Sequence, residues 1–101
     1  MSISVRVDDD RQRVEIQVFG SFDFSLFNDF RAAYIDYAKE YNDYLIDMQE
    51  VEYLDSAALG MLLSMRSAVG GDDSRITIAN ANAFIKNILM ISRFDKRFTI
   101  C

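Results

Sequence analysis

The sequence predicts one α/β domain over residues 1–101, a mixed β-sheet with helices packed on it in the order β-β-α-β-α-β-α-β. Three patterns favour this fold class. Apolar residues alternate with polar ones near the amino terminus, as in half-buried strands. Later apolar runs have the length of buried strands. Between these runs, apolar residues recur at steps of three and four, which is typical of helices that pack on a sheet.

The first two predicted strands form a β-hairpin that leads into a helix. Apolar side chains alternate over residues 3–7 and again over residues 14–18, with a polar turn between them. We expect Gly20 to end the second strand and Ser25 to cap the following helix. Apolar residues then keep helical spacing over residues 26–41, so the first helix is expected there.

The central part of the chain predicts a buried strand and a buried helix. Residues 44–48 form a short apolar run, consistent with a strand covered on both faces, and a polar loop is expected at residues 49–54. A helix should begin near Asp55 and end at Gly70. Its predicted core positions are Ala58, Leu62, Met65 and Val69, with Leu59, Met61 and Leu63 widening the apolar face.

The last third of the chain predicts one more strand, helix and strand. Residues 75–79 alternate as a strand. Either Asn80 or Asn82 can cap a third helix, whose apolar positions are Phe84, Ile85, Ile88 and Leu89. A short final strand is expected at residues 97–100.

Composition excludes several classes of function. The formal charge of −5 and the scattered basic residues argue against a nucleic-acid surface. The chain has no histidine, the commonest general base and metal ligand. No apolar run is long enough to span a membrane, and the start lacks a secretory leader, so we expect a cytoplasmic protein without membrane insertion. The single cysteine, Cys101, cannot form an internal disulfide.

Residues 53–60 combine a carboxylate, a hydroxyl and small side chains at the start of the buried helix. A phosphate on Ser56 would lie at the positive end of that helix and would add about −1.5 to −2 charge beside Asp55. A simpler interpretation is that Asp55 or Ser56 is only a helix cap, and that Ala57, Ala58 and Gly60 allow close packing. Spacing alone leaves both interpretations open.

Four segments resemble the STAS domains of anti-sigma factor antagonists. Leu-Ile-Asp-Met at residues 45–48 matches the end of a family strand, and Asp-Ser-Ala-Ala-Leu-Gly at residues 55–60 matches an Asp-Ser-Ser-Gly-Leu-Gly-type motif. Residues 20–24 take the place of a Gly-x-Leu-Asp turn, and residues 92–96 that of a Gly-Leu-Asp-Lys-type motif. The likeness covers essentially the whole chain. It is nearest to short antagonists of Gram-negative bacteria that regulate biofilm, motility or attachment.

This resemblance implies a STAS fold and a phosphorylation switch at Ser56. In the family, the partner anti-sigma factor is a serine kinase that phosphorylates this serine, and the phosphorylated antagonist is released from it. A PPM-type phosphatase then removes the phosphate and restores the serine. ATP and Mg²⁺ would then belong to the partner, and the chain needs no cofactor or metal of its own. The residues implied to bind the partner are Asp23, Asp55, Ser56, Ala57, Ala58, Leu59 and Gly60.

The resemblance is incomplete at two places. Ala57 and Ala58 replace a second serine and a glycine, which leaves Ser56 as the only hydroxyl of the motif. Arg93 stands where the later motif usually has glycine, so the partner contacts that the resemblance implies near the third helix do not carry over to this position. Asp47 either frames the site or is a structural carboxylate that accepts backbone hydrogen bonds.

Two other functions are compatible with the same residues. The chain could be a constitutive STAS adaptor subunit of a transporter or other assembly, with Ser56 as a contact or a cap. An enzyme with Ser56 as nucleophile and Asp55 as helper is disfavoured, because serine needs a positioned base and the chain has no histidine. We therefore expect a binding protein without catalytic residues.

Overall fold

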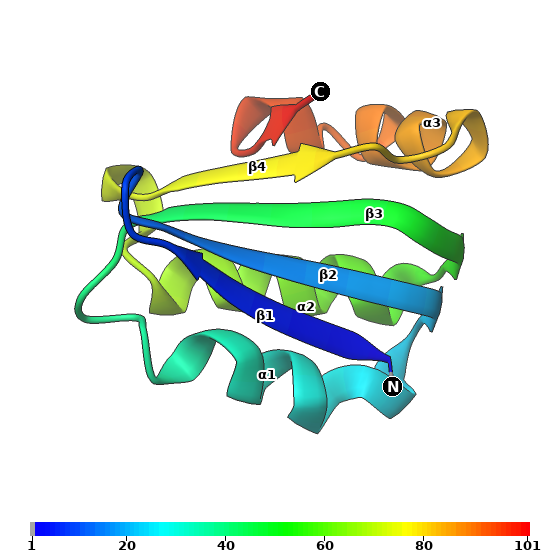
Figure 1. The fold of residues 1–101 in the computed structure, drawn as a ribbon. Coiled ribbons are helices and arrows are strands. Elements are labelled where there is room, and N and C mark those ends of the chain that lie inside the picture. The colour runs from blue at the N-terminus through cyan, green and yellow to red at the C-terminus, as the bar shows by residue number, and fades with distance from the viewer. Residues whose placement is uncertain (1) are drawn as a thin grey trace.

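The computed structural model describes residues 2–101 and contains a five-stranded sheet in the order β1-β2-β3-β4-β5 (Figure 1). β1 and β2 are antiparallel, and every other neighbouring pair is parallel. This architecture confirms the predicted mixed α/β fold. The strands are β1 (Ile3–Asp8), β2 (Arg13–Phe22), β3 (Asp43–Leu54), β4 (Arg75–Ala79) and β5 (Thr99–Ile100).

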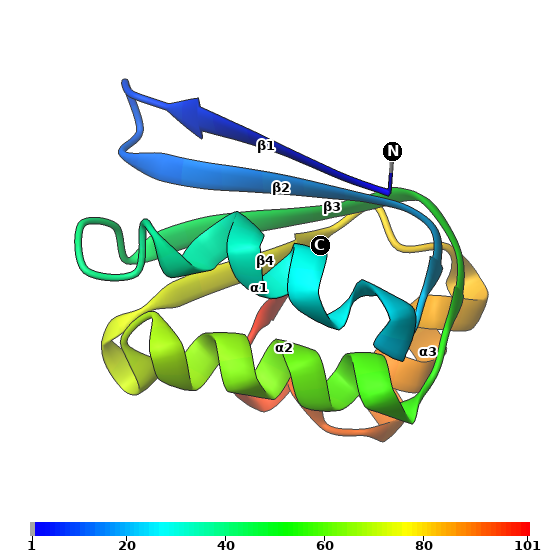
Figure 2. The same ribbon diagram turned by 90° about the horizontal axis from the view of Figure 1, so that it is seen from below.

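Three α-helices connect the parallel strands. Helices α1 and α2 run side by side along one face of the sheet, and α3 lies near β4 (Figure 2). In the part of the chain that the structure describes, no helix covers the opposite face (Figure 2). The helices are α1 (Phe27–Ile35), α2 (Ser56–Ala68) and α3 (Ala83–Ile91), and the 3-10 turns are η1 (Phe24–Leu26), η2 (Gly71–Asp73) and η3 (Phe94–Lys96).

One apolar core lies between the sheet and the helices. Alternate residues of β2 and β3 point into it and are fully buried, whereas their neighbours face the uncovered side of the sheet. All four core positions predicted for this helix are buried, including Val69, which is the C-cap of α2. Leu63 was expected to widen this face, but it is 37% exposed, because it lies about 100° further round the helix than Leu62.

The expected loop at residues 49–54 is wrong, because β3 continues as a strand to Leu54. Two register shifts between β2 and β3 place extra residues on β3, so the buried positions become Met48, Val51 and Leu54, three residues apart. Gly20 lies at the second shift with φ 78° and does not end β2, which runs to Phe22. An alternating pattern cannot reveal a strand that carries two bulges.

The first helix also differs from its prediction at both ends. Ser25 does not cap α1: Asp23 caps the preceding η1 turn, and α1 begins at Phe27 after Leu26, which makes no side-chain cap. The helix ends at Ile35, short of residue 41, because the backbone N–H of Tyr37 bonds the C=O of Tyr34 and tightens the turn.

At the carboxyl end of the chain, Asn82 is the cap of α3. Its side chain accepts a hydrogen bond from the N–H of Ile85 at 2.9 Å, which resolves the choice between Asn80 and Asn82. The last strand, β5, is shorter than expected and pairs with β4 at Thr77 and Ile78. Within residues 2–101, none of the helices has the length and apolar character needed to cross a membrane.

Candidate functional site

The parallel strands direct their carboxyl ends to one edge of the sheet, which we call the carboxyl edge. Asp23 follows β2, Asp55 follows β3 and Asn82 lies just after β4. Each of these residues caps the helical segment that comes next. Figure 2 shows η1 and the beginnings of α2 and α3 gathered at this end of the molecule. The topology therefore brings residues far apart in sequence to a common surface.

Asp55 and Ser56 have different roles at the start of α2. The Asp55 side chain accepts a hydrogen bond from the N–H of Ala58 at 3.0 Å, so Asp55 is the N-cap. Ser56 is the first residue of the helix and is exposed. The early N–H groups of a helix carry a partial positive charge, which favours negative groups placed there. The serine is therefore accessible at an end that accommodates a phosphate.

The other predicted contact residues divide between the surface and the core. Asp23 is half-buried and accepts hydrogen bonds from the N–H and the hydroxyl of Ser25, at 2.9 and 2.5 Å. Ala57 and Leu59 are half-buried. Ala58 is fully buried, so the expectation that it contacts a partner is wrong: its place on α2 faces the sheet.

Gly60 is exposed, and a Cβ added there would meet no heavy atom within 4 Å. Close packing inside this protein therefore does not require a glycine at residue 60. The absence of a side chain leaves the backbone of α2 open one turn after Ser56, where a partner could approach it closely.

Asp47 has the geometry of a structural carboxylate. Its Oδ1 accepts hydrogen bonds from the backbone N–H of Gln49 at 2.9 Å and from the side-chain amide of Asn80 at 3.1 Å. Gln49 lies at the first register shift of β3, where regular pairing with β2 is interrupted. The carboxylate thus satisfies a backbone donor and links β3 to the turn after β4.

Three exposed aromatic side chains near the carboxyl edge were missed as site residues. Phe24 of η1 is 66% exposed, Tyr53 at the end of β3 is 49% exposed, and Phe84 at the start of α3 is 60% exposed. The sequence places Phe84 and Ile85 together among the apolar positions of the third helix, but neighbouring helical residues point in directions about 100° apart. This spacing was the available signal that both could not be buried, and only Ile85 is buried.

The second motif, at residues 92–96, does not lie beside Ser56 in the structure. Arg93 has φ 63° and ψ 29°, a left-handed conformation that glycine adopts with less strain. It lies in a hollow with Leu63 of α2, about two helical turns beyond Ser56. Close by, the Arg66 Nε of α2 donates a hydrogen bond to the C=O of Arg97 at 3.2 Å. The structure therefore places residues 92–96 along α2, away from its first turn.

Known proteins resemble this chain in sequence and in fold. The family model described as Mlab, STAS domain matches residues 5–100. A STAS-domain containing protein of Pseudomonas aeruginosa (strain UCBPP-PA14) is 41% identical over 100 residues, which cover 99% of this chain and 99% of that protein.

Two solved structures share the arrangement of strands and helices. The Bacillus anti-sigma factor antagonist SpoIIAA, in its unphosphorylated form, has a TM-score of 0.76 at 15% identity and covers 99% of this chain and 87% of its own. An anti-sigma factor antagonist from Mycobacterium paratuberculosis has a TM-score of 0.74 at 21% identity, with 98% and 85% covered. These identities establish likeness of fold, and the match in sequence establishes the family. The chain belongs to the STAS-domain family.

Proposed function

We propose that this protein is a cytoplasmic anti-sigma factor antagonist of a partner-switching pathway, built as one STAS domain over residues 1–101. The unphosphorylated form binds an anti-sigma factor or related serine-kinase regulator. Phosphorylation of Ser56 by that partner releases the complex, and a PPM-type phosphatase restores binding. Catalysis, ATP and Mg²⁺ belong to the partner proteins. The process it regulates is bacterial attachment, biofilm formation or motility.

The observation that carries this proposal is the position of Ser56. It is an exposed hydroxyl on the first residue of α2, and the neighbouring Asp55 already caps the helix. The hydroxyl is therefore not needed as the cap of α2, and the serine is accessible to a kinase. That SpoIIAA has been solved in unphosphorylated and phosphorylated forms supports the same use of this fold.

A phosphate would change binding through electrostatics. Ser56 follows Asp55 in sequence and lies at the same carboxyl edge as the elements that carry the exposed aromatic residues. Apolar contacts with a partner exclude water from such a surface, and an additional charge of about −1.5 to −2 there loses hydration and repels acidic groups. The helix end can hold the phosphate without unfolding, so the fold persists while the partner dissociates.

The site can be tested with the partner kinase recovered by affinity purification on the immobilised protein. Incubation with this kinase and MgATP should add one phosphate to the wild type, measured by intact mass and peptide mapping. Ser56→Ala should remain unmodified. Ser67→Ala removes another exposed serine of α2 and should be modified like the wild type. Full phosphorylation of Ser56→Ala would contradict the assignment.

The switch can be tested by calorimetry of the same partner against unmodified protein, phosphorylated protein, Ser56→Ala and Ser56→Asp. We expect Ser56→Ala to bind even after kinase treatment. Ser56→Asp should bind more weakly than the unmodified protein, because its one negative charge reproduces part of the charge of a phosphate. Equal affinity of the unmodified and phosphorylated proteins would reject the switch. Stoichiometric purification with a transporter ATPase would then identify the protein as a constitutive adaptor subunit.

A further inference from the structure

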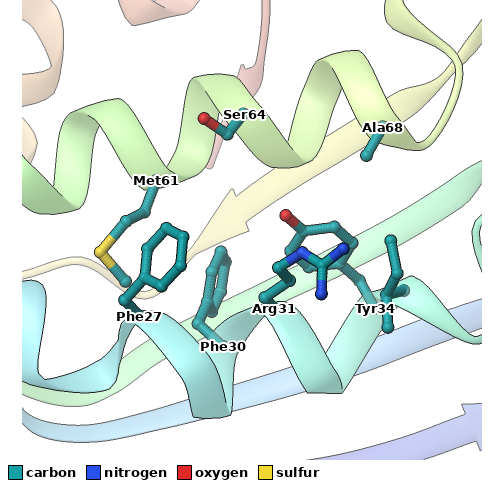
Figure 3. Close-up of a pocket in the computed structure, with 8 residues that line it drawn as sticks. Phe27, Phe30, Arg31, Tyr34, Met61, Ser64 and Ala68 are labelled. Atoms are coloured by element: carbon teal, nitrogen blue, oxygen red, sulfur yellow. The ribbon is translucent and has the colours of Figure 1, made fainter.

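A groove between α1 and α2 has the composition of a small binding site. Its cavity volume is about 220 Å³, and its apolar walls are built mainly by Phe27 and Phe30 of α1 and Met61 of α2 (Figure 3). Phe27 is 39% exposed, and Ile35, at the other end of α1, is 36% exposed. Large apolar side chains thus remain open to solvent at the groove although Phe30 and Met61 beneath them are buried.

Three polar side chains, Arg31, Tyr34 and Ser64, line this mainly apolar groove. Figure 3 shows the Tyr34 hydroxyl directed toward α2 and the Arg31 guanidinium lying between the helices. Tyr34 is only 4% exposed. Burial raises the pKa of its phenol, and the nearby positive charge of Arg31 partly opposes this rise. Few polar groups in a mainly apolar concavity are typical of small-ligand sites.

The charge of the groove is opposite to the net charge of the chain. Arg31 is the one charged residue in its lining, and across residues 2–101 it takes part in none of the ion pairs within 4.0 Å. The chain as a whole carries a formal charge of −5. A cation without a carboxylate partner, next to exposed apolar surface, is complementary to a ligand that is both anionic and apolar.

The volume limits the size of that ligand. A cavity of about 220 Å³ suits a short hydrocarbon chain or one aromatic ring. We propose that the groove between α1 and α2 binds a small carboxylate with an apolar chain or ring. Its apolar part lies against Phe27 and Met61, and its carboxylate pairs with Arg31. This site is distinct from Ser56 and does not depend on the partner switch.

The probe for this site is sodium octanoate, titrated into ¹⁵N-labelled protein and followed by amide chemical shifts. We expect saturable shifts concentrated on residues 27–35 and 61–68. 1-Octanol has the same chain without the charge and should bind about tenfold more weakly, and octylammonium more weakly still. Binding of octylammonium equal to that of octanoate would overturn the proposed charge preference.

Two variants separate the contributions of charge and space. Arg31→Gln should lower the affinity for octanoate by about tenfold and change the affinity for octanol by less than about twofold. Arg75 is an exposed arginine on β4, and Arg75→Gln should change neither affinity. Ala68→Phe should fill the groove and abolish binding of both, and Ala32→Phe, on an exposed position of α1 outside the groove, should not.

Melting temperatures of the four variants show whether each remains folded. Shifts centred on Phe84 instead of the groove, or unchanged octanoate affinity in folded Arg31→Gln, would reject the site. Protection of the groove amides only when a protein partner is added, with no response to octanoate, would identify a protein interface there and likewise reject the small carboxylate.

Discussion

A single carboxylate, Asp47, stabilises the irregular part of β3. The register shift between β2 and β3 interrupts regular pairing near Gln49, and the Asp47 side chain accepts the hydrogen bond of that backbone N–H at 2.9 Å. The same oxygen also accepts from the Asn80 amide, where the backbone turns with φ 64° after β4. At the scale of one residue, this aspartate determines how two neighbouring strand ends are held together.

Removal of this acceptor should destabilise the fold. Asp47→Ala leaves the N–H of Gln49 and the amide of Asn80 without their shared partner, so we expect a loss of about 1 to 2 kcal/mol in the free energy of unfolding. Asp47→Asn keeps an acceptor oxygen and should lose less. Urea denaturation of both variants measures the difference. Equal stability of Asp47→Ala and the wild type would refute the structural role.

At the scale of an element, α2 has two functions on opposite sides. Its inner side places Ala58, Leu62 and Met65 in the core with no measurable exposure. Its outer side presents Ser56 at the first turn and Gly60 one turn later. The buried side packs the helix against the sheet, which keeps the first turn at a constant position for the proposed partner.

Truncation of the buried side should be far more costly than truncation of the neighbouring surface. Leu62→Ala and Met65→Ala should each lower the free energy of unfolding by about 2 to 5 kcal/mol, because they leave cavities in the core. Leu63→Ala removes the same atoms as Leu62→Ala from a side chain that is 37% exposed, and should cost less than about 1.5 kcal/mol. Thermal and urea unfolding measure both effects. A similar loss for Leu62→Ala and Leu63→Ala would contradict the orientation of α2.

At the scale of the whole molecule, the parallel order of β2, β3 and β4 creates the proposed binding surface. Their carboxyl ends meet at one edge, together with η1 and the starts of α2 and α3 (Figure 2). Tyr53 lies at the end of β3, Phe24 in η1 and Phe84 in the first turn of α3. These aromatic side chains are separated widely in the sequence. Exposed aromatic residues are common anchors of protein interfaces, and the edge combines them with a modifiable hydroxyl.

Aromatic residues from separate elements should therefore contribute to the same complex. Phe24→Ser and Phe84→Ser should each weaken binding of the purified partner by about 5- to 30-fold while changing the stability of the fold by less than about 0.5 kcal/mol. Val5→Ser is the control, since Val5 is 38% exposed on β1, away from this edge. Calorimetry with the partner measures all three. Weakening by Val5→Ser alone would place the interface elsewhere.

Much of the fold can be predicted from the sequence because its signals are local. Alternation identified the hairpin, helical spacing identified the buried face of α2, and the Asp-Ser step placed the start of that helix. The side-chain period follows directly from backbone geometry, so regular elements are visible in one dimension. The motif at residues 55–60 was visible for the same reason, as a contiguous run of residue types.

The tertiary structure alone decided where those regular patterns stop. The bulges of β3 depend on register with β2, the early end of α1 on hydrogen bonds at Tyr37, and the burial of Ala58 on the direction in which α2 packs. The placement of η1 and the starts of α2 and α3 at one end of the sheet likewise depends on the parallel strand order. Sequence determined which residue types each element carries, whereas contacts between distant segments determined which of those residues reach the surface together, because burial and register are properties of pairs of elements.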